Sequence, residues 1–452
     1  MAFDRVSTSS VAPLAAGLVA AALAMTGCRG EDLPIDCDNQ STKFRKQMEA
    51  EELPLLTPVP EAGPYPVAFQ LTEEGVNRLL GKKFNDAEIP FTGQLPFGPA
   101  TFDFEPEGDP VIRFGELPDC PNCLLLSLEF QVQLLNAGQP LSTGFGAVDL
   151  SVPLVLEADE ALGQTRLIAD YGSVKIEELE LAVYGFSSAE HEQYAGAIKV
   201  LLTEQLQDEF GQLELLSIGS WNIGGGNIRL LARELLVYPE HNKLALGMQT
   251  NLQLPASAGL DLDAPLPDDV PMAVMFDSQL FLSMSHRMLA EGSIPRRYNE
   301  DGNADPAGIY AVTLDKMVGN EAGATQLDSE FNVWRIADGY CGNVRAAMPL
   351  TLAVTENRKG FRVAAGGATL IEGEGSGLQA LEEEELVDEN QDLIDTFRSA
   401  LADSVGSTIN YDAFDVEDAV IVINVLDLTV TDREVSSLLD FAVYDAPADD
   451  GG

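Results

Sequence analysis

The feature that most constrains this chain is a unit that occurs twice: a long amphipathic helix followed by two extended segments. The first copy runs from Ser187 to Leu246 and the second from Leu386 to Leu439. Ser187 and Glu190 have the spacing of a capping box at a helix start. Gly211 is suited to the left-handed cap at the helix end, and Gly406 stands at the same place in the second copy. A repeated unit of this size predicts a body built from two similar halves.

Each of the two helices carries an apolar stripe at helical spacing, which defines one buried face. The stripe residues are Tyr194, Ile198, Leu201 and Leu202 in the first helix, and Leu393, Ile394, Phe397 and Leu401 in the second. Plain core is the commoner role for such a stripe, whereas the wall of an apolar ligand site is the alternative. The residues alone leave both readings open.

The segments before each helix alternate apolar and polar residues, as antiparallel strands with one buried face do. Residues 91–184 contain four such segments, and the second half repeats their order. Gly146 corresponds to Gly342, and Pro153 corresponds to Pro349, at an offset of 196 positions (342 − 146 and 349 − 153). A proline within each equivalent strand predicts a sheet edge or a bulge, because proline cannot donate to the ladder. We therefore expect an α+β fold with two tandem domains.

The N-terminus indicates export. Arg5 precedes an apolar stretch, and "AMTGCRG" resembles a bacterial lipobox that ends at Cys28. Acylation of Cys28 would anchor the chain to the outer membrane of a bacterial envelope without spanning it. The alternative is an ordinary cleaved signal with Cys28 as a spare thiol. The predicted organisation is a lipoprotein signal peptide (1–27), an acidic tether with one or two helical turns (28–64), a first domain (65–255), a linker (256–270), a second domain (271–446) and a disordered tail (447–452).

The charge and the remaining cysteines narrow the class of protein. A formal net charge of −47 argues against binding to nucleic acid, because a polyanion repels phosphate backbones. An even number of cysteines after Cys28 favours two disulfides in an exported protein, and four cysteines allow three pairings. We favour Cys120 with Cys123 and Cys37 with Cys341. The "CPNC" spacing also occurs in redox and zinc sites, but the residues after Cys123 indicate a strand rather than a helix.

The sequence contains no recognisable catalytic or metal-binding motif. Its three histidines, His191, His241 and His286, lie outside the spacings of metal sites and catalytic triads. We expect no enzyme activity, no metal site and no cofactor.

The order of elements resembles the tubular lipid-binding (TULIP) superfamily, with tandem domains on a bacterial lipoprotein. The segment "FQLTEEGVNRLLGKKF" is similar to the opening pattern of bacterial members, with Glu74, Asn77 and Leu80 in place. The resemblance implies that each domain is a strongly curved antiparallel sheet wrapped around one long helix. It also implies an apolar tunnel that binds or transfers acyl lipid or another apolar ligand, with the eight stripe residues as its wall. The alternative is a non-catalytic surface or periplasmic scaffold, adhesin or assembly lipoprotein with filled cores.

Overall fold

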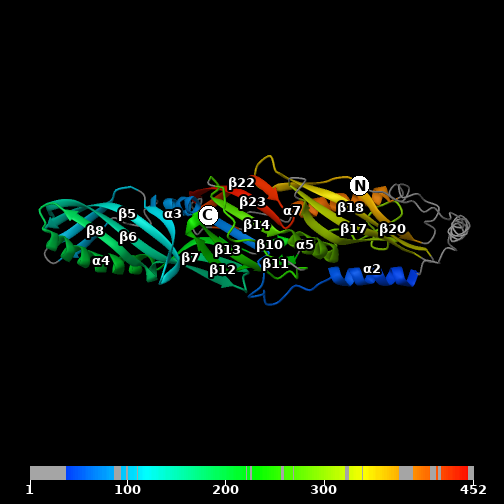
Figure 1. Cartoon of the computed structure of the whole chain (residues 1–452), viewed down its shortest axis with the longest axis horizontal. Helices are drawn as coiled ribbons and strands as arrows, with labels where there is room; N and C mark the ends of the chain where they lie inside the picture. Colours follow the sequence, from blue (N-terminus) through cyan, green and yellow to red (C-terminus); the bar gives the residue numbers. More distant parts are fainter. Residues whose placement is uncertain are drawn as a thin grey trace, which may run out of the picture.

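The protein is an elongated α+β molecule, formed mainly by curled antiparallel sheets and a few helices (Figure 1). The computed structural model describes residues 37–85, 93–97, 100–108, 110–219, 221–223, 226–255, 259–267, 269–320, 325–337, 340–375, 390–407, 414–415 and 419–445. The predicted signal peptide, Cys28 and the predicted C-terminal tail lie outside these ranges.

The described elements follow one another in two similar series. The first comprises α2 (Cys37–Glu51), β1 (Val67–Thr72), α3 (Glu73–Asn85), β2 (Gly93–Phe97), β3 (Ala100–Pro106), β4 (Val111–Leu117), β5 (Cys120–Asn136), β6 (Gln139–Asp159), β7 (Gln164–Asp170), η1 (Tyr171–Ser173), β8 (Lys175–Val183), α4 (Ser188–Phe210), β9 (Gln212–Ile218), β10 (Trp221–Ile223), β11 (Gly226–Ile228), β12 (Leu230–Tyr238), η2 (Pro239–His241) and β13 (Lys243–Thr250). The second comprises β14 (Met272–Asp277), α5 (Ser278–Glu291), β15 (Arg297–Tyr298), β16 (Tyr310–Asn320), β17 (Gln326–Ala337), β18 (Tyr340–Val354), β19 (Phe361–Ala365), β20 (Thr369–Gly375), α7 (Gln391–Ser407), β21 (Phe414–Asp415), β22 (Ala419–Val430) and β23 (Glu434–Asp445).

The two halves meet in one central sheet with the order β12-β13-β1-β14-β23-β22. Each half supplies three strands in mirrored order, and β1 pairs antiparallel with β14, with Val67 opposite Phe276. The two halves are therefore related by an approximate two-fold axis between β1 and β14. Their apolar side chains form a continuous core that includes Phe69 of the first half and Val274 of the second. The expected arrangement of two tandem domains is thus not confirmed, because the strands at the junction complete one another's hydrogen bonds.

Outside the central sheet, each half carries a curled sheet, and the two sheets have the same strand pairing around β6 and β18. The short strand β21 of the second series joins the first-half sheet by pairing with β9. In the first half β6 pairs with β5 along one side and with β8 and then β7 along the other. In the second half β18 pairs with β17, and with β20 and then β19. Pro153 and Pro349 each lie where the partner changes, between Ser151 and Leu154 in β6 and between Ala347 and Leu350 in β18. A residue without an amide proton is tolerated there, because no strand on that side requires its N–H.

The two long helices differ in their boundaries from each other and from expectation. Helix α4 begins with the predicted capping box, and Gly211 follows it with a φ of +48°. Helix α7 is shorter, begins at Gln391 and continues through Gly406 to Ser407, so the expectation that Gly406 ends this helix is wrong. Leu386, the predicted start of the second unit, lies outside the described residues.

Part of the segment expected to be a tether is a helix of 15 residues, α2, that packs on the outer face of the second half (Figure 1). Phe44 lies against Trp334, with 5.8 Å between ring centroids. The buried carboxylate of Glu51 pairs with Arg296 and accepts a hydrogen bond of 2.7 Å from the Leu314 amide. Four helical turns form instead of one or two because α2 packs on an apolar surface of β16 and β17. Sequence periodicity does not predict this contact between distant segments.

The predicted linker also makes defined contacts in its described part, residues 259–267. Leu262 packs with Ala68, Ala245 and Met275 on the outer face of the central sheet. This segment therefore covers the junction of the two halves. Within the described part of the chain, no helix has both the length and the apolar character needed to cross a bilayer.

Candidate functional site

A small apolar cavity lies between α4 and the inner face of the first-half sheet. Its walls consist only of apolar side chains, from β3, β5, β6 and α4: Phe102, Phe104, Leu128, Phe130, Val132, Val148, Ile198 and Leu202. Its volume is about 20 Å³. A cavity of this size has room for about one water molecule, and an apolar lining gives that water no hydrogen-bond partner. The site is therefore a dry gap beneath a helix and not an open tunnel.

Helix α4 is held firmly at its N-terminal end. The Ser187 hydroxyl accepts a hydrogen bond from the Glu190 amide, and the Glu190 carboxylate accepts one from the Ser187 amide. The hydrogen bonds that the Glu190 carboxylate accepts from the Ser187 amide and the Ser187 hydroxyl lower the pKa of Glu190 from its ordinary value. One turn later, the His191 Nε2 atom accepts a hydrogen bond of 3.1 Å from the Val183 amide at the end of β8. The start of the helix is thus bound to the sheet independently of the apolar gap.

Aromatic side chains close the gap at the same end. Tyr194 is half-buried and contacts Phe102 edge-on, with 5.8 Å between ring centroids, and Phe186 at 4.8 Å. Beyond them, Ile198 and Leu202 face the sheet and are nearly buried. The side chain of Leu201, the fourth predicted wall residue, lies outside those that the structure describes. The first-half stripe therefore supplies two walls of the gap and one residue at its rim.

The stripe residues of the second half are more deeply buried than the described stripe residues of the first. Leu393, Ile394, Phe397 and Leu401 of α7 are 2% exposed or less. The Phe397 ring packs on Phe331 of β17, with 5.0 Å between centroids. The four predicted wall residues of the second half are therefore buried in the core, and their role as a ligand wall stays a prediction. The offset of 195 places Phe397 where the first half has Leu202 (397 − 195), so the second half carries the larger side chain at this position.

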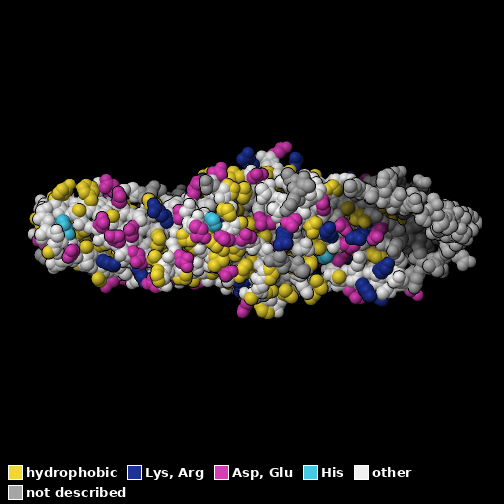
Figure 2. Space-filling view, viewed as in Figure 1, with side chains coloured by type: hydrophobic (Ala, Val, Ile, Leu, Met, Phe, Trp, Pro, Cys, Tyr) yellow, Lys and Arg dark blue, Asp and Glu magenta, His cyan; other side chains and the backbone are white. Residues whose placement is uncertain are grey.

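Two open grooves with acidic walls flank the apolar gap. One, of about 460 Å³, shares Phe104 and Val132 with the gap and is also lined by Asp103, Glu105 and Tyr184. The other, of about 900 Å³, runs between β8 and α4 beside several glutamates. Figure 2 shows acidic side chains spread over the visible face of the molecule. Because Asp103 and Glu105 alternate with Phe102 and Phe104 along β3, the smaller groove lies on the other face of the sheet from the gap.

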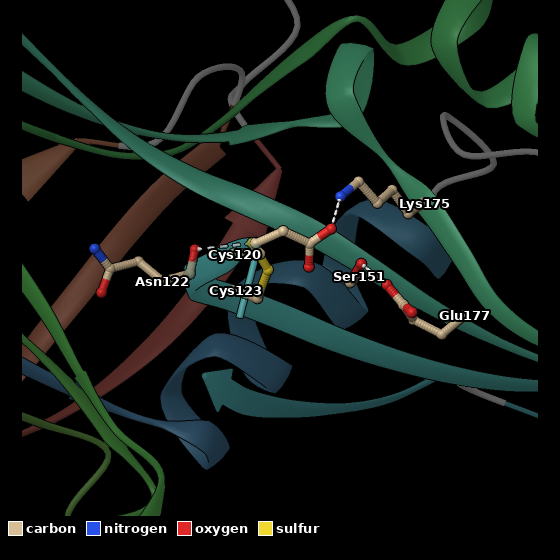
Figure 3. Close-up of a disulfide and its surroundings, with 7 residues drawn as sticks. Cys120, Asn122, Cys123, Ser151, Lys175 and Glu177 are labelled. Carbon is tan, nitrogen blue, oxygen red and sulfur yellow. Dashed lines mark hydrogen bonds and ion pairs between the residues drawn. A yellow bond between two sulfur atoms is a disulfide. The ribbon is translucent and has the colours of Figure 1, made fainter. Parts of the chain in front are cut away.

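The cysteines occupy different environments. Cys120 and Cys123 form a disulfide at the start of β5, with 5.8 Å between their Cα atoms (Figure 3). Between them, the Asn122 side chain donates a hydrogen bond of 3.1 Å to the Leu235 carbonyl of β12. This arrangement links the first-half sheet to the central sheet and leaves the strand after Cys123 intact. The side chains of Cys37 and Cys341 lie outside those that the structure describes, so their predicted pairing stays a prediction.

Sequence reasoning missed the wall residues that come from strands. Phe102, Phe104 and Phe130 alternate with polar residues, which predicts that they are buried but not what they face. Only the curl of the sheet brings β3, β5 and β6 around one helix. The three phenylalanines on the inner faces of β3 and β5 are the sequence signal that could have indicated these wall residues.

Neither a protein-family model nor a curated protein matches this sequence. Solved structures with a similar fold include lipopolysaccharide binding protein, at 11% identity and a TM-score of 0.40, over 85% of this chain and 100% of that one. They also include P47 of Clostridium botulinum E1, at 11% identity and a TM-score of 0.47, over 83% of this chain and 99% of that one. P47 from Clostridium botulinum A2 gives 11% identity and a TM-score of 0.45, over 82% of this chain and 96% of that one. At this identity the comparisons assign neither a family nor an activity to the chain.

Proposed function

We propose that this protein is a non-catalytic lipid-binding protein that takes an acyl chain between α4 and the first-half sheet. The observation that carries the proposal is the gap lined by eight apolar side chains beneath a single helix. We propose further that the fold is of the tubular lipid-binding type. Its support is the repeated topology, in which each half places one long helix beside a curled sheet and both share a central sheet.

The gap must widen before it can hold an acyl chain. The free energy gained by burying the chain exceeds the cost of moving the two side chains. Moving Ile198 and Leu202 away from the sheet exposes two aliphatic side chains, at a cost of about 1.5–3 kcal/mol each. A buried twelve-carbon chain gains about 0.8 kcal/mol per methylene, hence on the order of 10 kcal/mol. Occupancy therefore outweighs opening. The firm N-terminal attachment of α4 at Ser187 and His191 provides the pivot for this motion.

The second half has the role of a support in this proposal. The stripe residues of its helix α7 are 2% exposed or less, and α2 packs on its outer face. If Cys28 is acylated, the nine residues from Cys28 to Cys37 reach at most about 30 Å. The start of α2 lies at the end of the molecule farthest from α4 (Figure 1). The anchored protein would therefore hold the second half near the outer membrane and direct the acyl site away from it.

The test is uptake of a fluorescent acyl probe by delipidated protein. Leu202→Trp fills the gap and is expected to reduce probe uptake at least tenfold. Val200→Trp is the matched control, because Val200 lies on the same helix and is 57% exposed; this variant should bind as the wild type does. If the wild type takes up no probe, or if both variants bind equally, the proposed site is wrong, and a scaffold with filled cores becomes the better reading.

A second measurement tests the anchor. Native mass spectrometry of protein extracted from its own membrane should show the mass of an acylated N-terminal Cys28 and of retained lipid. Cys28→Ser should release the protein from the membrane without changing probe uptake. If Cys28→Ser stays on the membrane, the proposed lipid anchor is wrong, whereas the proposed acyl site is unaffected.

A further inference from the structure

A histidine and two carboxylates converge at the junction of the two halves, outside the acyl site. Glu240 and His241 belong to η2, the turn that joins β12 to β13. Asp263 belongs to the segment that connects the halves. One ligand atom of each of these three side chains lies within 4.8 Å of the others. The sequence separation between the turn and Asp263 hides this convergence from motif searches.

The spacing suits a metal ion. The His241 Nε2 atom lies 3.2 Å from the Asp263 Oδ1 atom. Two ligands bound at about 2.0–2.1 Å to one tetrahedral zinc ion are roughly 3.3 Å apart. The existing pair therefore already spans one edge of a coordination tetrahedron. Glu240 is exposed and can rotate to complete a third position, which leaves the fourth to water.

The backbone around Asp263 is held in place by groups that do not bind the ion. The Asp263 amide donates a hydrogen bond of 3.1 Å to the Asp261 carboxylate. The ammonium of Lys243, which is buried, donates to the carbonyls of Leu262, at 2.8 Å, and of Ala264. Both neighbours of Asp263 are thus fixed to the sheet that carries His241. Such outer contacts orient the residues that bind the ion and raise the affinity for the metal.

The local charge also favours a cation. The carboxylates of Glu240, Asp261 and Asp263 all lie near the Lys243 ammonium. Three carboxylates therefore stand against one ammonium around His241, and a divalent ion would relieve their repulsion.

We propose that Glu240, His241 and Asp263 bind a zinc ion that joins the β12–β13 turn to the segment connecting the halves. An imidazole ligand disfavours magnesium and calcium, which prefer oxygen donors alone, and suits zinc. This site goes beyond the acyl-binding proposal and does not depend on it. Its role is structural, because it closes the outer cover of the central sheet.

The experiment titrates chelator-treated full-length protein with Zn²⁺, and in parallel with Co²⁺, whose visible absorption reports its ligands. We expect one saturable site in the wild type and a rise in the thermal midpoint when it fills. His241→Gln and Asp263→Asn should each weaken binding at least tenfold and remove the rise in midpoint. His191→Gln is the matched control, since His191 is also half-exposed, and it should bind zinc as the wild type does.

Two outcomes overturn the proposal. If the wild type shows no saturable binding, His241 and Asp263 form only an ion pair. If His241→Gln binds zinc with unchanged affinity and stoichiometry, the ion is held elsewhere. Circular dichroism of each variant without metal checks that the substitution leaves the fold intact.

Discussion

Equivalent substitutions in α4 and α7 should have different costs, because α4 borders the apolar gap whereas the stripe residues of α7 are 2% exposed or less. The pair is Ile198→Ala and Leu393→Ala: the offset of 195 puts these residues at the same place in their helices (393 − 198), and both are nearly buried. Leu393 is 2% exposed, so its truncation should leave a new cavity and cost about 3–4 kcal/mol. Ile198 already lacks partners on the side of the gap, so its truncation should cost about 2 kcal/mol.

An acyl ligand should separate the two variants further. In Ile198→Ala, one of the two side chains that must move is already truncated, so opening costs about 1.5–3 kcal/mol less. The ligand therefore binds roughly tenfold or more tightly than to the wild type, since each 1.4 kcal/mol is a factor of about ten. A ligand at 100 times its Kd stabilises the protein that binds it by about 2.7 kcal/mol.

The assay is urea unfolding, followed by circular dichroism, with and without a neutral twelve-carbon monoacylglycerol. Ligand should raise the unfolding midpoint of Ile198→Ala more than that of the wild type. In Leu393→Ala the ligand effect should equal that of the wild type, because this substitution lies away from the gap. Equal rescue of both variants, or rescue of Leu393→Ala alone, would refute the placement of the acyl site in the first half.

Three further predictions concern other parts of the molecule. Phe44→Ala removes the aromatic contact with Trp334 and should free α2, so limited proteolysis should cleave within residues 37–64 at protease levels that leave the wild type intact. Burial raises the pKa of Glu51 to about 7 from an ordinary 4.5. The contribution of Glu51 to stability is therefore full below pH 4.5 and is lost as the pH rises through 7. Urea unfolding should show that the free energy of unfolding of the wild type declines over this range, and that this decline is absent in Glu51→Gln. The Cys120–Cys123 disulfide closes a loop of only three-residue separation, so its removal by Cys120→Ser with Cys123→Ser should lower the free energy of unfolding by at most about 2 kcal/mol, measured by thermal unfolding. A larger loss would mean that the disulfide also positions Asn122 against β12.

Local structure was largely predictable from the sequence. The capping box at Ser187, the stop at Gly211 and the strand after Cys123 all depend on neighbours within one or two turns, and the structure confirms them. The prediction that Gly406 ends α7 was wrong, although it also relied on a local signal. Glycine permits a left-handed cap but does not require one, and α7 continues for one more residue where its packing allows.

The repeated pattern of apolar residues by itself determined that the chain is α+β and that its helix and strand units occur twice, because periodicity and turn residues act through the backbone nearby. Tertiary structure alone decided the rest. The pairing of β1 with β14 merges the halves into one sheet. The curl of the first-half sheet brings three strands around α4 to line the gap, and α2 packs on strands more than 250 residues away. Such contacts depend on volume and edge complementarity between distant segments, and no local pattern encodes which partner will supply them.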